Sequence, residues 1–249
     1  TADHNTAVGT NALGANTSGT RNTAIGAIAM EDNTTGTNNT AVGKGALANN
    51  TTADDNCAFG IESLFDNTAG AGNTGYGYAT LANNTTGGDN VAVGKNALVA
   101  NTEASNNIAV GSGALAANTT GTGNIAMGRN TLIANTTANF NTGVGHNTLD
   151  ANTTGAENTG IGREALGANT TGAANTGSSN VYLGRDTGIT GSPGGNNTDG
   201  SGAIFLGDEN IGNAYIQVAW SVTSDARDKT DVEPIKTGLD FVNKLEPVT

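Results

Sequence analysis

The chain repeats itself every seventeen residues, and this period constrains the fold more than any other feature. Residues 5–21 are followed by a close copy at residues 22–38, and a glycine recurs at the same interval from Gly9 to Gly162. An asparagine stands four residues before each of these glycines, and a leucine stands four residues after it, with Met30 as the one exception. Internal repetition at this length predicts a solenoid rather than a single thick core.

Each repeat is too short for a helical hairpin and lacks helix-forming composition, but it suits one β-coil with two short strands and two turns. The segment "TAVG" predicts a first strand with Val8 and its equivalents pointing inward, and "NALGA" predicts a second strand with Leu13 and its equivalents inward. The segment "NTTG" predicts a turn, since Asn and Gly tolerate positive φ. Coils of this kind pair at about 4.8 Å. We therefore expect an all-β solenoid, or β-roll, with about ten coils in residues 1–174.

The asparagine columns have two interpretations. Their amides can donate to one neighbouring coil and accept from the other as a ladder, or they can simply serve the turns. The core of each coil is thin, with small residues such as Ala7 and Ala12 beside one large aliphatic residue per strand. A thin solenoid gains stability by burying a second face against copies of itself, so we expect a homotrimer.

Composition excludes several functions. The net charge of −12 argues against binding to nucleic acid, which needs clustered Lys and Arg. The single cysteine, Cys57, excludes an intrachain disulfide and a cysteine-based metal site. The chain has no apolar run of about 18 residues, so no insertion into a membrane is expected. No cofactor and no metal are expected either, since His4 and His146 lie far apart in the sequence without a ligand pattern.

Two resemblances point to a fibre. The repeat "NTAVGxxALxANTTG", over residues 5–174, resembles the β-roll head repeats of trimeric autotransporter adhesins and the repetitive stalks of phage tail fibres. This resemblance implies a trimeric extracellular rod. It leaves the ligand open.

Residues 175–223 depart from the strict period. Asn175 is expected to begin an eleventh, irregular copy whose register breaks at Ser178 and Ser179. The segments "VYLGRD" at 181–186 and "AIFLGD" at 203–208 are expected as looser copies of the strand and glycine. We expect this irregular β segment to close the trimer, with Trp220 sealing the end of its core.

Residues 224–249 contain Ser224, Asp225, Arg227 and Lys229, followed by spaced aliphatic residues and "LEPV". This pattern resembles the opening of the intramolecular chaperone domain of endosialidase-type phage tailspikes. The resemblance implies trimer assembly followed by self-cleavage before Ser224, with Ser224 as nucleophile and Lys229 as base. The family's domain is longer, so we expect it to continue beyond this sequence, and within these residues alone we expect an exposed charged turn.

A basic column follows the repeated glycines, and it is a candidate site for anionic cell-surface glycans. Its members are Lys44, Lys95, Arg129, His146 and Arg163, with Arg185 in a looser copy. The alternative is a solvated column, or one paired with Glu62, Asp150 or Glu164. Glycosidase chemistry needs two converging carboxylates, which the scattered acidic residues do not define.

The sequence therefore predicts a structural and host-attachment segment of a phage tail fibre, exposed on the virion, binding itself and a host-surface glycan, and without catalysis beyond the self-cleavage. One alternative is the head of a trimeric adhesin on a bacterial surface. Another is an ice-binding solenoid. Ice binding needs flat ranks of Thr, but the Thr6 column is broken by Cys57 and three aliphatic residues, and the Thr17 column is followed directly by a second residue that faces the opposite way in a strand.

Overall fold

The structure is a computed structural model, and it describes residues 2–167, 178–185, 187 and 204–206. These residues contain no helix and twelve strands of three residues each. The strands are β1 (Thr6–Val8), β2 (Thr23–Ile25), β3 (Thr40–Val42), β4 (Cys57–Phe59), β5 (Thr74–Tyr76), β6 (Val91–Val93), β7 (Ile108–Val110), β8 (Ile125–Met127), β9 (Thr142–Val144), β10 (Thr159–Ile161), β11 (Val181–Leu183) and β12 (Ile204–Leu206).

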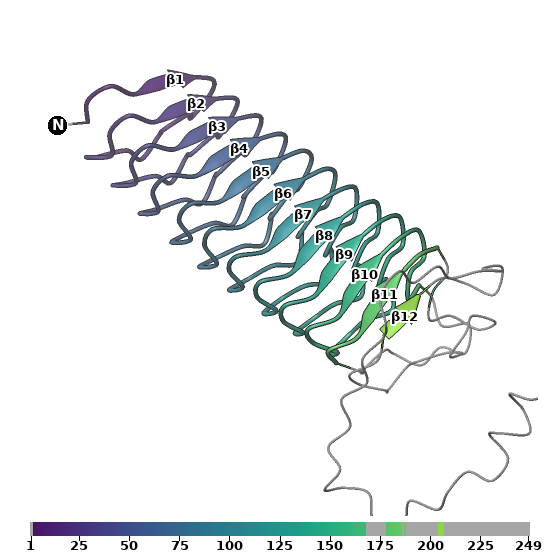
Figure 1. The fold of residues 1–249 in the computed structure, drawn as a ribbon. Helices are drawn as coiled ribbons and strands as arrows, with labels where there is room; N and C mark the ends of the chain where they lie inside the picture. Colours follow the sequence, from purple (N-terminus) through teal and green to yellow (C-terminus); the bar gives the residue numbers. More distant parts are fainter. Residues whose placement is uncertain (1, 168–177, 186, 188–203, 207–249) are drawn as a thin grey trace, which may run out of the picture. The chain divides into compact units, whose positions relative to one another are not determined.

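All twelve strands form one parallel sheet in the order of the sequence. Equivalent residues pair directly, as where Ala7 lies opposite Ala24 and Ala24 lies opposite Ala41. Figure 1 shows the strands stacked one behind another, each carried by one coil of the chain. The predicted all-β solenoid with seventeen-residue coils is confirmed.

The first strand of each coil exists, but the prediction that Val8 and its equivalents point inward is wrong. Val8 is 58% exposed and Tyr76 is 60% exposed, whereas the middle residue of the strand, such as Ala24, is fully buried. The cause is the two-residue period of a strand. The asparagine before each strand is buried, so the middle residue also faces inward and the last residue faces outward.

The predicted second strand is absent from the described coils, although its leucine is inward as expected. Leu47, Leu98 and their equivalents are fully buried, but they adopt φ near +50° and lie in a turn. The residue two before each leucine also has a positive φ, as at Asn96. This side of the coil therefore bends in tight left-handed steps, while its N–H groups still bond to the next coil, as from Leu98 to Ala114 at 3.0 Å.

The asparagine columns form ladders, which decides between their two interpretations. In the column that begins at Asn5, each side-chain oxygen accepts from the backbone N–H of the next asparagine, as from Asn39 to Asn22 at 2.9 Å. In the column that begins at Asn16, each amide donates to the asparagine one coil earlier, as from Asn50 to Asn33 at 2.8 Å. These buried amides form hydrogen bonds from one coil to the next. They therefore hold neighbouring coils in register without a large apolar core.

The eleventh coil begins at Asn180, not at Asn175 as expected. The N–H of Asn180 donates to Asn158 Oδ1 at 3.0 Å, which is the bond that Asn158 makes to Asn141 one coil earlier. Twenty-two residues separate these two partners, so five extra residues fall between Gly167 and Ser178. Strands β11 and β12 confirm the two looser copies.

The chain divides into two compact units, Thr1–Ile211 and Gly212–Thr249, and all the described residues belong to the first. Strands β11 and β12, which lie in the looser copies expected after residue 174, belong to the first unit. The predicted segments around Trp220 and at 224–249 lie outside the described residues.

Candidate functional site

The outward side of the strands is the most distinctive surface of the stack, and we call it the strand face. It carries two columns of side chains, because the first and third residues of each strand point outward. The third-residue column is apolar in every coil and remains open to solvent in the single chain. Its most exposed members are Val8, Ile25, Tyr76, Met127, Ile161, Leu183 and Leu206.

Aromatic rings extend this apolar column in the middle of the stack. Phe59 and Tyr76, in adjacent coils, stack with ring centroids 5.7 Å apart. Beside them Tyr78 is 48% exposed, and Lys95 Nζ lies 5.9 Å from the centre of its ring. Soluble chains seldom leave a continuous apolar stripe of this kind uncovered, so the strand face has the character of an interaction surface.

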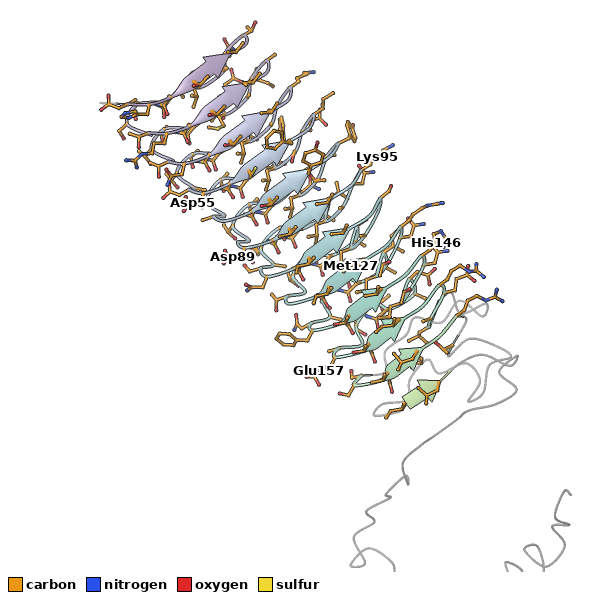
Figure 2. All side chains as sticks on the ribbon, turned by 45° about the horizontal axis from the view of Figure 1, so that its top comes forward. Asp55, Asp89, Lys95, Met127, His146 and Glu157 are labelled. Atoms are coloured by element: carbon orange, nitrogen blue, oxygen red, sulfur yellow. The ribbon has the colours of Figure 1, made fainter. Side chains whose placement is uncertain are left out.

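The basic column lies along one edge of the strand face. Its residues come directly after the repeated glycines, where each strand has ended, and Lys44, Lys95 and Arg129 are exposed. Figure 2 shows Lys95 and His146 on this edge, with Met127 on the strand face itself. The structure thus brings the candidate glycan residues into one row, including Arg163 at its far end.

Acidic residues lie along the opposite edge, where the chain enters each strand. Figure 2 shows Asp55, Asp89 and Glu157 on this side. All three are exposed and adopt φ near +60°, which turns the chain into the buried asparagine that follows. We call this row the acidic edge; the sequence analysis missed it because the acidic residues occupy only some coils.

The partners expected for the basic column are found in one case. Arg163 pairs with Glu164, the next residue, at 2.6 Å. Among the residues that the structure describes, Glu62 and Asp150 form no ion pair. Burial raises the pKa of the Asp150 carboxyl, with a further rise from the charge of Glu164 and an opposing decrease from nearby backbone N–H groups and His146.

Other candidates offer little chemistry. Burial raises the pKa of the Cys57 thiol, which keeps it protonated and weakly nucleophilic at neutral pH. Within the described ranges, no cluster of His, Cys, Asp and Glu could hold a metal ion, and no helix could cross a bilayer. Ser224 and Lys229 lie outside those ranges, so the proposed self-cleavage pair stays a prediction.

The sequence did contain signals for the strand face. The middle strand residue is always small from Ala7 to Gly160, whereas the last residue varies from Val to Phe, Tyr and Met. A buried position between close-packed coils tolerates little variation in size, so the varied column is the outward one. Searches of protein-family models, curated proteins and solved structures return no match to this chain.

Proposed function

We propose that this chain is a structural and host-attachment segment of a phage tail fibre, exposed on the virion, in which three copies lie side by side along their coils. The observation that supports this proposal best is the uncovered apolar column of the strand face. In the strict seventeen-residue repeats, a coil buries little more than one leucine, two small residues and two asparagines. Covering the strand face is the remaining way to bury large apolar side chains, worth roughly 25 cal/mol per Å².

The repeat itself supports a structural role. In the sheet each strand pairs only with the strands of the neighbouring coils, so stability accumulates along the stack. The resemblance of the repeats to adhesin heads and fibre stalks agrees with this role. The alternative within the same structural class is that the chain is the head of a trimeric adhesin on a bacterial surface.

Ice binding is less well supported. The hydroxyl groups of the Thr17 column donate to the backbone carbonyl one coil ahead, as from Thr34 to Thr51 at 2.9 Å and from Thr85 to Thr102 at 3.0 Å. Because these hydroxyl groups already donate to backbone carbonyls of the next coil, they are not free to donate to water molecules at an ice surface. A purified chain without thermal hysteresis would close this alternative.

The mass of the particle in solution tests the proposal. We expect light scattering at micromolar concentration to give three times the chain mass of 24.6 kDa. A monomer would contradict the proposal and favour a solenoid that acts alone. A dimer would contradict the trimeric rod while keeping the strand face as an interface.

Two further parts of the proposal have their own tests. A glycan array with the four basic residues Lys44, Lys95, Arg129 and Arg163 changed to Ser tests whether they bind host glycans.

Intact mass spectrometry tests the cleavage before Ser224. We expect the 249-residue chain to stay intact. We expect a version extended by its natural downstream sequence to be cut unless Ser224→Ala is present.

A further inference from the structure

The two edges of the strand face carry opposite charge, and these charges do not meet within one chain. Asp89 enters strand β6 and Lys95 leaves it, so six residue steps separate them. At about 3.3 Å per residue these steps span up to about 20 Å, far beyond an ion pair. Among the described residues neither Asp89 nor Lys95 forms an ion pair.

At two strands the opposite charges of the two edges lie at equal height along the stack. Asp89 and Lys95 flank the same strand, β6, and Glu157 and Arg163 flank the same strand, β10. Asp55 enters β4 while Lys44 leaves β3, which is an offset of one coil, about 4.8 Å. Strands β5 and β7 carry no charge at either edge, since they are flanked by Gly72 and Tyr78 and by Asn106 and Ser112.

No strand from β1 to β11 carries the same sign of charge at both edges. Arg21 on the acidic edge is flanked across β2 by Ala27. At β9 the residue on the acidic edge is Phe140, which is 61% exposed. The basic column has Arg129 one coil earlier, so the guanidinium of one chain could lie over the Phe140 ring of the next as a cation–π pair. Opposite charges therefore lie at equal height at β6 and β10 and one coil apart at β3 and β4, and no like charges oppose each other, which suits two parallel chains in register.

We propose that the strand face is the interface between three parallel copies of this chain, in register about a threefold axis, with the basic column of each copy against the acidic edge of the next. This inference rests on the proposed trimeric rod and names its interface. A closed ring needs two different, complementary edges on every chain, because each chain meets its two neighbours through different surfaces. The charge pattern therefore indicates that a second copy of this chain covers the strand face.

The width of the strand face agrees with this arrangement. Three faces up to about 20 Å wide form a triangle whose sides lie within about 6 Å of the central axis, since a side of an equilateral triangle lies at about 0.29 of its length from the centre. Packed sheets lie about 10 Å apart, so each contributes about 5 Å of side chain. The apolar column, with Val8, Tyr76 and Met127, is therefore placed to fill the axis.

Cysteine cross-linking tests the pairing directly. In a Cys57→Thr background, which restores the residue found at this position in β3 and β5, we would introduce Asp89→Cys and Lys95→Cys and add a short bis-maleimide. We expect covalent trimers on a reducing denaturing gel, because each chain links to two different neighbours. Covalent dimers without trimers would indicate a twofold interface and overturn the ring.

A matched control uses Asp89→Cys with Glu103→Cys in the same background. Glu103 is exposed in the same coil but lies on the turn after the second asparagine column, away from the strand face. We expect no covalent trimer from this pair. Equal cross-linking of the control and the test pair would overturn the inference, because it would show contact without regard to the strand face.

Charge reversal provides an independent measurement. Asp89→Lys with Glu157→Lys should weaken trimer association at least tenfold at low salt, and adding Lys95→Glu with Arg163→Glu should restore most of it. A trimer that is indifferent to the first pair of changes would overturn the edge pairing while leaving the proposed fibre intact. A wild-type monomer would instead overturn the proposed function. Loss of glycan binding with an unchanged trimer on neutralising the basic column would assign those residues to glycans and also overturn the pairing.

Discussion

The strand side and the turn side of each coil are both bonded to their neighbours, yet they place side chains in opposite ways. On the strand side the large residue, such as Met127, faces outward and the small Ala126 faces inward. On the turn side the large residue, such as Leu132, faces inward at φ +54°. The comparison shows that a coil of the strict repeat has room inside for one row of large side chains, and that this row is on the turn side, where the left-handed turn points the leucine inward.

The two sides also use glycine and asparagine differently. Where the strand ends, each glycine has φ between about 117° and 141°, and a Cβ there would collide with the backbone of the glycine in the next coil. On the turn side the left-handed residues are mostly not glycine, because their side chains have space. Close backbone approach, rather than φ alone, therefore demands the repeated glycine.

The largest effect should come from placing a charge on the inner row. Leu132→Asp buries an unpaired carboxylate between coils, and we expect it to cost more than about 4 kcal/mol and to unfold the adjacent coils. The matched change Met127→Asp, in the same coil but on the strand face, should leave the circular dichroism spectrum unchanged and, if the chain forms the proposed trimer, should abolish the trimer mass. Equal loss of β structure in both variants would contradict the difference between the two sides.

A smaller but still severe effect is expected at the end of a strand. Gly111→Ala forces a Cβ into the backbone of Gly128 at φ +139°, and we expect a loss of roughly 3 kcal/mol, read as a lower melting temperature. Its control is Gly113→Ala, two residues later, where the nearest atom is the flexible side chain of Asn130 and where Ala79 occupies the equivalent position. Similar melting temperatures for the two variants would show that the glycine column is not a packing requirement.

The asparagine ladder should contribute less per residue. Asn118 donates to Asn101 Oδ1 at 3.1 Å and to the Gly121 carbonyl at 2.9 Å, and it accepts from Asn135 at 3.0 Å. Asn118→Ala leaves these buried groups without a partner, which typically costs about 1–3 kcal/mol. Thr120→Ala, at an exposed position two residues away, should change stability by no more than about 0.5 kcal/mol in the same denaturant titration.

The smallest effect concerns pH. The folded-state pKa of Asp150 is raised, so the folded chain holds this proton more tightly than the unfolded chain, and the stabilisation present at low pH is lost as the pH rises through the folded pKa. Asp150→Asn should therefore match the wild type near pH 3 and exceed it slightly at pH 7. Thermal melts at both values would measure this, and a variant that loses stability only at pH 7 would reverse the sign of the effect.

Much of the fold was predictable because the repeat is strict. The seventeen-residue coil, its parallel stacking and the burial of Leu13 and its equivalents followed from the sequence, and the structure confirms them. Two predictions failed, for different reasons. Val8 was placed inward because hydrophobicity was used to judge direction, whereas the buried amides of Asn22 and its equivalents determine which strand residues face inward. The second strand was expected from its alternating pattern, whereas its leucines adopt left-handed turn conformations.

The sequence by itself determined the period, the columns and the identity of the residues that recur in them. Only the tertiary structure decided how the leucine column reaches the interior, because that depends on left-handed turns at residues such as Leu98 that no composition rule predicts for a leucine. It also brought Asp89 and Lys95 to opposite edges of one face. Residues six apart in sequence have no fixed relation until the strand between them extends and the coils on either side hold it straight.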